Sequence, residues 1–214
     1  APMAVHWPSR LPHDDADLVT PRYSVRSLGD KACLFVSNYV RQYPMAVQKD
    51  VQFSVELPHE TVTFPAQPFD IPSGAYFIWP VNMDLAGATL AYATAEPVTR
   101  VDAGKTAVYV FRAQDGVKAE FAFDDESTAS VTASSGTVTH RDGHYIVSDL
   151  HAGTDASIDL KTSHGSTVRV LVLTSAQTDI LTLPVLEGRP HLMLTKSETF
   201  VDAHGLSLLS LDDP

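Results

Sequence analysis

Apolar and polar residues alternate along much of the chain with a period of two. In Val51–Leu57 every second residue is apolar, and the alternation resumes at Val62 and Phe64 after a break at Pro58. A period of two places one face of a strand in a core and the other face in water. Two such runs with a short break between them predict an antiparallel hairpin.

A second pair of runs is separated by a turn dipeptide. Lys105–Phe111 and Val117–Phe123 flank Asp115-Gly116, whose glycine suits the positive φ of a tight turn. We therefore predict a tight hairpin closed by this dipeptide. Further turn signals occur at Gly29-Asp30, Ser135-Gly136, Asp142-Gly143, His164-Gly165 and His204-Gly205. Their spacing predicts many short strands, as in a sandwich or a meander of hairpins.

Signals for helices are few. Thr174 or Ser175 is suited to cap one or two helical turns, which must end before Pro184. This predicts one short helix near residues 174–182. The preceding run, Thr167–Leu173, is apolar on both faces, so we expect a strand at the centre of a sheet, covered on both sides. The predicted fold class is all-β.

The composition changes along the chain and suggests three parts. Residues 1–17 are rich in Pro, His and Asp and lack periodicity, which indicates a linker or a strap lying on a neighbour. Residues 18–101 are rich in proline and aromatic side chains and form a predicted N-terminal hairpin subdomain. Residues 102–214 are similar to a seven-strand sandwich in strand length and turn frequency, and include the C-terminal strands.

Charge and composition exclude several classes of partner. The 214 residues carry a formal charge of −11, which repels phosphate backbones, so we expect no nucleic acid partner. No apolar run approaches the roughly 20 residues of a membrane helix, and no signal peptide is expected. The single cysteine, Cys33, cannot form an internal disulfide, and its apolar surroundings predict a buried, inert thiol.

No constellation of catalytic or metal-binding residues is visible. His140 and His144 enclose a turn and are expected to flank a hairpin, while His59-Glu60 lacks the second histidine of a zinc-protease motif. There is no G-x-S-x-G or G-x-G-x-x-G motif. Seven glutamates are present, but Glu120, like Glu56, falls on the polar side of its strand, as solvated residues do. We therefore predict no catalytic residue, no metal site and no cofactor.

The aromatic run Tyr76-Phe77-Ile78-Trp79-Pro80 allows two interpretations. Exposed Trp79, Tyr76 or Trp7 would provide platforms on which the apolar faces of sugar rings stack. Alternatively, the alternating side chains fill the two faces of a covered strand or a domain interface, which is the commoner role of large aromatics. We favour packing, and keep these three residues as candidate carbohydrate-binding residues.

The order of the segments resembles that of a known family. Residues 17–45 are similar to the segment that follows the catalytic barrel in family 35 β-galactosidases. Residues 51–100 look like the second domain of that family, with the core string DLAGATLAYATAE at Asp84–Glu96. Near the C-terminus, RVLVLTSAQTDIL and HLMLTKSETFVDAHGLSL resemble the family's strand, short helix and pair of strands.

The resemblance implies an all-β module in which antiparallel hairpins merge with an immunoglobulin-like β-sandwich. It also implies a non-catalytic accessory domain that packs on a catalytic (β/α)8 barrel and on later domains of the same polypeptide. The catalytic glutamates of the family belong to that barrel, so none is transferred to this sequence. A periplasmic or secreted location and contact with galactosides are further implications. The alternative is an autonomous carbohydrate-binding module.

Overall fold

The largest sheet of the described residues has eight strands. The computed structural model describes residues 3–14, 16–202 and 205–210. The strand order in this sheet is β1 (Ala4–His6), β2 (Arg22–Leu28), β3 (Lys31–Ser37), β6 (Tyr76–Leu85), β7 (Ala88–Ala93), β10 (Ala119–Asp124), β13 (His144–Leu150) and β12 (Thr137–Arg141). β1, at one edge, lies in the segment that we predicted to be a linker or strap, and pairs with β2.

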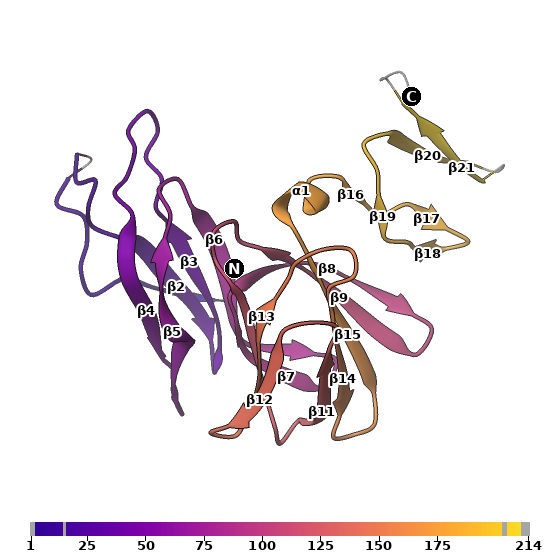
Figure 1. Cartoon of the computed structure of the whole chain (residues 1–214), viewed down its shortest axis with the longest axis horizontal. Coiled ribbons are helices and arrows are strands. Elements are labelled where there is room, and N and C mark those ends of the chain that lie inside the picture. Colours follow the sequence, from indigo (N-terminus) through magenta and orange to yellow (C-terminus); the bar gives the residue numbers. More distant parts are fainter. Residues whose placement is uncertain (1–2, 15, 203–204, 211–214) are drawn as a thin grey trace.

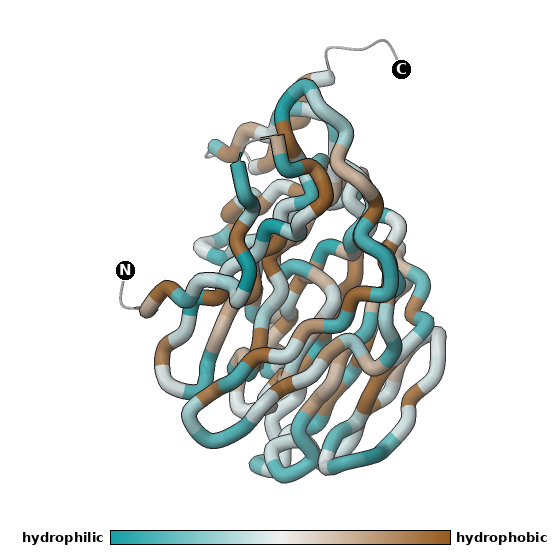
Figure 2. The backbone as a smooth tube through the Cα atoms, turned by 90° about the vertical axis from the view of Figure 1, so that its left-hand side faces the viewer, coloured by the Kyte–Doolittle hydropathy of each residue, from teal (hydrophilic) through white to brown (hydrophobic). Residues whose placement is uncertain are grey.

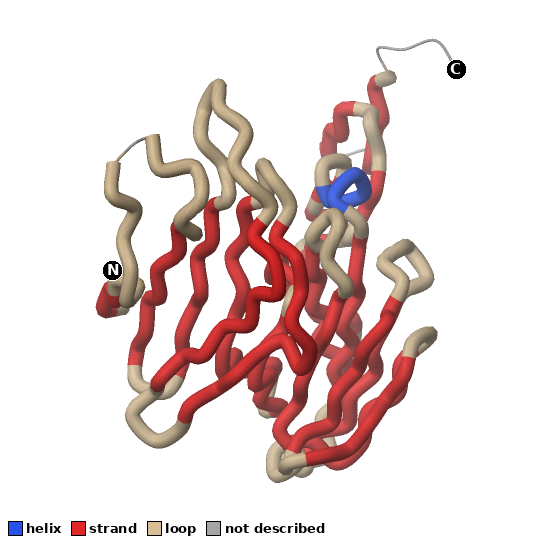
Figure 3. The backbone as a smooth tube through the Cα atoms, turned by 60° about the vertical axis from the view of Figure 1, so that its left-hand side comes forward, coloured by secondary structure: helices blue, strands red, loops and turns tan. Residues whose placement is uncertain are grey.

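A second sheet covers part of the first. Its strand order is β11 (Thr128–Ala133), β14 (Ser157–Thr162), β15 (Thr167–Leu173), β9 (Thr106–Ala113) and β8 (Ala95–Ala103). Figure 3 shows the two sheets as separate layers of strands, and Figure 2 shows apolar and polar residues alternating along them. β15 pairs in parallel with β9 and has β14 on its other side, so its predicted central position is confirmed. Its outer face is not covered near its start, where Arg169 is exposed.

The eight-stranded sheet contributes to two hydrophobic clusters, one on each face. The sandwich cluster lies against the five-stranded sheet and includes Leu90, Phe121 and Val147. The aromatic cluster lies on the opposite face and includes Trp79 and Ile146. Because adjacent residues of a strand point to opposite faces, β7, β10 and β13 supply side chains to both clusters.

Strand β6 changes the cluster to which it contributes halfway along its length. Phe77, Trp79 and Val81 belong to the aromatic cluster, whereas Leu85 belongs to the sandwich cluster. Between them Asn82 has a φ of 52°, an uncommon conformation for a residue with a side chain. This break in the alternation lets one strand serve both cores.

The hairpin of β4 (Gln48–Glu56) and β5 (Thr61–Ile71) packs on the aromatic cluster, and Figure 1 shows the hairpin beside β2 and β3. Glu56 pairs with Thr61, which confirms the hairpin predicted from the sequence. The register is interrupted between Phe64, opposite Phe53, and Phe69, opposite Val51. The four intervening residues, 65–68, include two prolines that lack an amide hydrogen. This segment, the β5 bulge, stands out of the pair.

The prediction of a tight hairpin at Asp115-Gly116 is wrong, although the turn itself is present. Gly116 has a φ of +75°, and the amide of Val117 donates to the carbonyl of Gln114 at 3.1 Å. β9 lies between β8 and β15, whereas β10 lies between β7 and β13 in the other sheet. Each strand is therefore paired on both sides within its own sheet, and the turn carries the chain from one layer to the other.

The single helix described, α1 (Ser175–Thr178), confirms the short helix predicted near residues 174–182. The Thr174 hydroxyl accepts a hydrogen bond from the amide of Gln177, whose side chain accepts in turn from the Thr174 amide. These reciprocal bonds satisfy donors that the first helical turn leaves free. Within the described ranges no helix is long and apolar enough to cross a membrane. The all-β class with antiparallel hairpins is therefore confirmed.

Three two-stranded sheets follow α1 in the described part of the C-terminal region. They are β16 (Leu181–Thr182) with β19 (Met193–Leu194), β17 (Val185–Leu186) with β18 (Arg189–Pro190), and β20 (Glu198–Asp202) with β21 (Gly205–Leu209). The β20–β21 hairpin extends away from the two sheets in Figure 1. Phe200 and Leu208 on this hairpin are 52% and 56% exposed.

Candidate functional site

Trp79 lies in the aromatic cluster and has no exposed surface. Its ring stacks on Phe77 with centroids 4.0 Å apart, and Phe69 approaches to 5.3 Å. Phe53 and Phe64 lie slightly farther away on the β4–β5 hairpin. A ring enclosed on every side has no face to offer a sugar, so the place of Trp79 is that of a packing residue.

Tyr76 and Trp7, the other two candidate residues, are exposed. Trp7 is 75% and Tyr76 61% exposed. Tyr76 begins β6, whereas Trp7 follows β1 at the edge of the sheet, with β2 and β3 between these strands. Three strand spacings separate the strands by roughly 14 Å. The structure therefore leaves both rings accessible without bringing them into one site.

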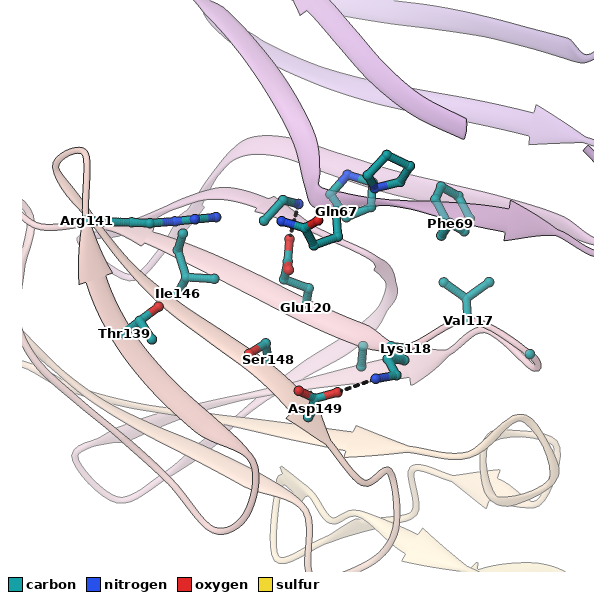
Figure 4. A pocket seen from close by; sticks show the side chains of 15 residues that line it. Gln67, Phe69, Val117, Lys118, Glu120, Thr139, Arg141, Ile146, Ser148 and Asp149 are labelled. Atoms are coloured by element: carbon teal, nitrogen blue, oxygen red, sulfur yellow. Dashed lines mark hydrogen bonds and ion pairs between the residues drawn. The ribbon is translucent and has the colours of Figure 1, made fainter. Parts of the chain in front are cut away.

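A cavity of about 420 Å³ opens beside the β5 bulge, where the β4–β5 hairpin stops covering the large sheet. Figure 4 shows this region, which we call the bulge cavity. One wall is formed by the bulge and Phe69, and the turn after β9 forms a second wall. Strands β12 and β13 provide the floor, with Thr139, Arg141, Ile146 and Ser148. Its lining thus comes from three separate segments of the sequence.

Glu120 fixes the bulge against the sheet. Its Oε1 atom accepts a hydrogen bond from the backbone amide of Ala66 at 2.7 Å and another from the Tyr92 hydroxyl at 2.8 Å. Burial raises the pKa of the Tyr92 phenol well above its usual value, and the negative charge of Glu120 raises it further. Tyr92 therefore stays a protonated donor, and Glu120 is held in one position at the edge of the cavity.

The charged groups of the cavity are only partly paired. Lys118 and Asp149 form an ion pair of 2.7 Å at the rim. Arg141 extends from β12 toward Gln67 and Glu120 in Figure 4. In the described part of the chain, Arg141 has no ion-pair partner, and the second oxygen of Glu120, Oε2, has no hydrogen-bond donor. A cationic donor and a free acceptor therefore face the same space.

A second group of interacting polar residues joins β6, β8 and β9. Glu96 and Arg112 form an ion pair, and Glu96 also accepts a hydrogen bond from the Ile78 amide at 2.6 Å. The carboxyl side chain is 14% exposed and the guanidinium side chain 25%. Glu96, near the start of β8, is thus joined to β9 in its own sheet by the ion pair and to β6 in the other sheet by the hydrogen bond. Both groups are partnered, so we assign the pair a structural role.

The histidines and the cysteine that the structure describes are not gathered at one place. His140 and His144 flank the turn between β12 and β13, as predicted, and His140 contacts Asp125 at 2.7 Å. Among the described residues, no group of three or more histidine, cysteine or acidic side chains is placed to hold a metal. Cys33 is half-buried rather than fully buried, and its partial burial raises the pKa of the thiol.

The sequence pattern does not indicate the bulge cavity, and the prediction that Glu120 is a solvated residue on the polar side of a strand is wrong. It is half-buried because the β5 bulge lies over it. Two prolines in the string PAQP, inside an otherwise alternating run, were the available signal for an interrupted pair. Nothing in the sequence linked that string to Glu120, 54 residues later than Ala66.

Comparison with protein families identifies the chain's relatives. A family model described as "Beta-galactosidase, domain 2" matches residues 24–193, which is most of the chain. No curated protein gave a match to the sequence.

Proposed function

The chain belongs to the beta-galactosidase domain 2 family, and on this basis we propose that it is a non-catalytic accessory domain of a β-galactosidase-like glycoside hydrolase of family 35. In this proposal it packs on a catalytic (β/α)8 barrel and on later domains of the same polypeptide. The family match is the observation that carries the proposal. Its division into a hairpin subdomain and an immunoglobulin-like sandwich, near residues 101–102, belongs to the same proposal.

Three aspartates of the described residues lack the raised pKa of a general acid, which agrees with the non-catalytic part of the proposal. A glycosidase needs two carboxyl groups roughly 5–10 Å apart across the scissile bond, one of them with a raised pKa. Asp17, Asp70 and Asp149 have pKa values below the usual value of an aspartate. The backbone amide of Thr20 donates a hydrogen bond that stabilises the Asp17 carboxylate, and Lys49 and Lys118 stabilise the carboxylates of Asp70 and Asp149. Such groups favour the ionised form, unlike a general acid.

The surface that we assign to the barrel is the face of β1, β2, β3 and β6 opposite the β4–β5 hairpin. We call it the open face. Its apolar side chains include Val5, Leu28, Tyr76 and Ile78, between 40% and 61% exposed. Arg22, Arg26 and Lys31 lie at the same face. Aromatic, aliphatic and arginine side chains together are typical of the central residues of protein interfaces.

The β20–β21 hairpin provides a second indication of neighbouring domains. An isolated two-stranded hairpin is only marginally stable in water. Phe200 and Leu209 lie on one of its faces, Val201 and Leu208 on the other, and all four are about half exposed. A hairpin that is apolar on both faces is suited to insertion between other parts of a larger protein.

Two measurements test this function. The purified chain should give no turnover of a chromogenic β-galactoside, and turnover that persists through purification would overturn the non-catalytic assignment. The chain should also co-purify with the family 35 barrel that the proposal places in the same polypeptide, expressed separately. Ile78→Asp on the open face should weaken that association, whereas Val138→Asp on β12 should leave it intact. The two side chains match as controls because they are 40% and 39% exposed.

A further inference from the structure

The unpaired polar groups of the bulge cavity have a chemistry of their own, separate from the open face. From the arrangement of Glu120, Arg141 and the hydroxyls beside them, we propose that this cavity is a binding site for a neutral saccharide. The site lies on the face of the eight-stranded sheet that carries the β4–β5 hairpin, and the open face is on the other side. A partner docked on the open face would leave the cavity accessible.

The charge of the cavity favours a neutral ligand. Lys118 and Arg141 balance Glu120 and Asp149, so the lining has no net charge. Lys118 and Asp149 already neutralise each other at the rim. The protein as a whole carries a formal charge of −11, which opposes an anionic ligand.

The donors and acceptors favour a ligand with hydroxyl groups. Oε2 of Glu120 can only accept a hydrogen bond, and the guanidinium of Arg141 can only donate. A hydroxyl group does both, so neighbouring hydroxyls on one ring can satisfy the carboxylate and the guanidinium together. Thr139 and Ser148, on adjacent strands of the floor, add hydroxyl groups of the protein.

The position of Glu120 is fixed before any ligand arrives. Its other oxygen, Oε1, is held by the Ala66 amide and the Tyr92 hydroxyl, so Oε2 has a defined direction. A group fixed in advance loses little conformational entropy on binding. This separates the site from a surface carboxylate that can rotate freely.

The apolar part of the lining and the size of the cavity complete the match. Phe69 and Val117 line the walls and Ile146 the floor, where they can contact the C–H face of a sugar ring. A volume of about 420 Å³ lies within the range of small-molecule sites, about 300–1,000 Å³. The cavity therefore combines an apolar surface with a few fixed polar groups, as ligand sites do.

Calorimetric titration of the full chain tests the proposal. The probes are lactose, cellobiose, maltose and sucrose, each up to about 50 mM, because we expect dissociation constants in the millimolar range. Saturable binding of at least one disaccharide is the expected result. Sodium sulfate is the control for an anion site at Arg141. Binding of sulfate without any disaccharide, or of none of the probes, would overturn the proposal.

Two variants place the binding in the cavity. Arg141→Met and Glu120→Gln should each lower the affinity for the disaccharide by about tenfold or more, because each removes one charged hydrogen-bonding partner. Arg41→Met, an exposed arginine outside the cavity, is the matched control and should bind as the unaltered chain does. Arg141 is exposed on an edge strand, so its variant tests binding even if Glu120→Gln is unstable. Unchanged affinity in Arg141→Met would show that the sugar binds elsewhere.

The outcome is independent of the accessory function. Arg141→Met should not alter co-purification with a catalytic barrel, and Ile78→Asp should not alter disaccharide binding. Failure of either proposal therefore leaves the other open to its own experiment.

Discussion

Replacing Trp79 by alanine removes the side chain at the centre of the aromatic cluster. The ring is fully buried, stacks on Phe77 and lies within 6.3 Å of Phe53, Phe64 and Phe69. A buried aromatic side chain removes about 150–250 Å² from water, worth about 4–6 kcal/mol at 25 cal/mol per Å². Its indole N–H has no hydrogen-bond partner among the described residues, which offsets about 1–3 kcal/mol of this gain.

The expected loss is therefore about 3 kcal/mol in the free energy of unfolding, the middle of a range of about 1–5 kcal/mol and the lower end of that measured for such substitutions. For a chain of this size, that loss lowers the melting temperature by roughly 10 °C. Urea and thermal denaturation followed by circular dichroism measure both quantities. Trp79→Phe should lose less, because it keeps a ring in the stack and removes the unpartnered N–H.

Trp7→Ala provides the control, because Trp7 is 75% exposed. Its stability should stay within about 0.5 kcal/mol of that of the unaltered chain. If Trp79→Ala lowers the free energy of unfolding by less than about 1 kcal/mol, the packing assignment is refuted, because removing a fully buried tryptophan side chain destabilises a protein by more than that.

Three further predictions concern stability. Gly136→Ala should lower the free energy of unfolding by about 3 kcal/mol, because a Cβ atom there would lie 2.3 Å from the carbonyl oxygen of Ser148. The control Gly165→Ala, also at positive φ but with open space around it, should lower it by only about 1–2 kcal/mol, as measured by urea denaturation. Because its pKa is raised in the folded chain, Tyr92 keeps its proton above pH 10, where the unfolded chain loses it, so the free energy of unfolding should decrease steadily as the pH rises above about 10. Tyr92→Phe should fall less steeply over the same range, and equal slopes would contradict the pKa assignment. Glu96→Gln should lower the free energy of unfolding by about 2–3 kcal/mol, because it leaves the charge of its half-buried arginine partner uncompensated, and a thermal shift assay that finds no change would contradict this.

Local patterns predicted the elements of the fold better than their arrangement. The hairpin around Pro58 and the helix capped by Thr174 depend on residues close together in sequence, and both are confirmed. The prediction of a hairpin at Asp115-Gly116 is wrong because a turn dipeptide specifies a change of chain direction and does not specify the sheet to which each strand belongs. That choice is made by β8, β15, β7 and β13, which lie far from the turn in sequence.

The candidate site was harder to predict, since its parts share no motif. The aromatic run drew attention to Trp79, but alternation alone already implied that Trp79 and Tyr76 point to opposite faces. The bulge cavity depends on a slip in pairing between β4 and β5 that brings Ala66 onto Glu120. A pairing register of this kind is decided by the packed structure, and one sequence does not contain it.

The sharing of one sheet by two cores bears on how the domain holds together. If the hairpin and sandwich parts were independent, each would need to bury its own apolar surface with its own strands. Instead β10 supplies Phe121 to the sandwich cluster and Ala122 to the aromatic cluster, and β13 does the same with Val147 and Ile146. Neither cluster can lose these strands without exposing the other. A boundary near residues 101–102 would therefore separate two regions of sequence that share strands and unfold together. A substitution that destabilises one hydrophobic cluster should destabilise the other as well.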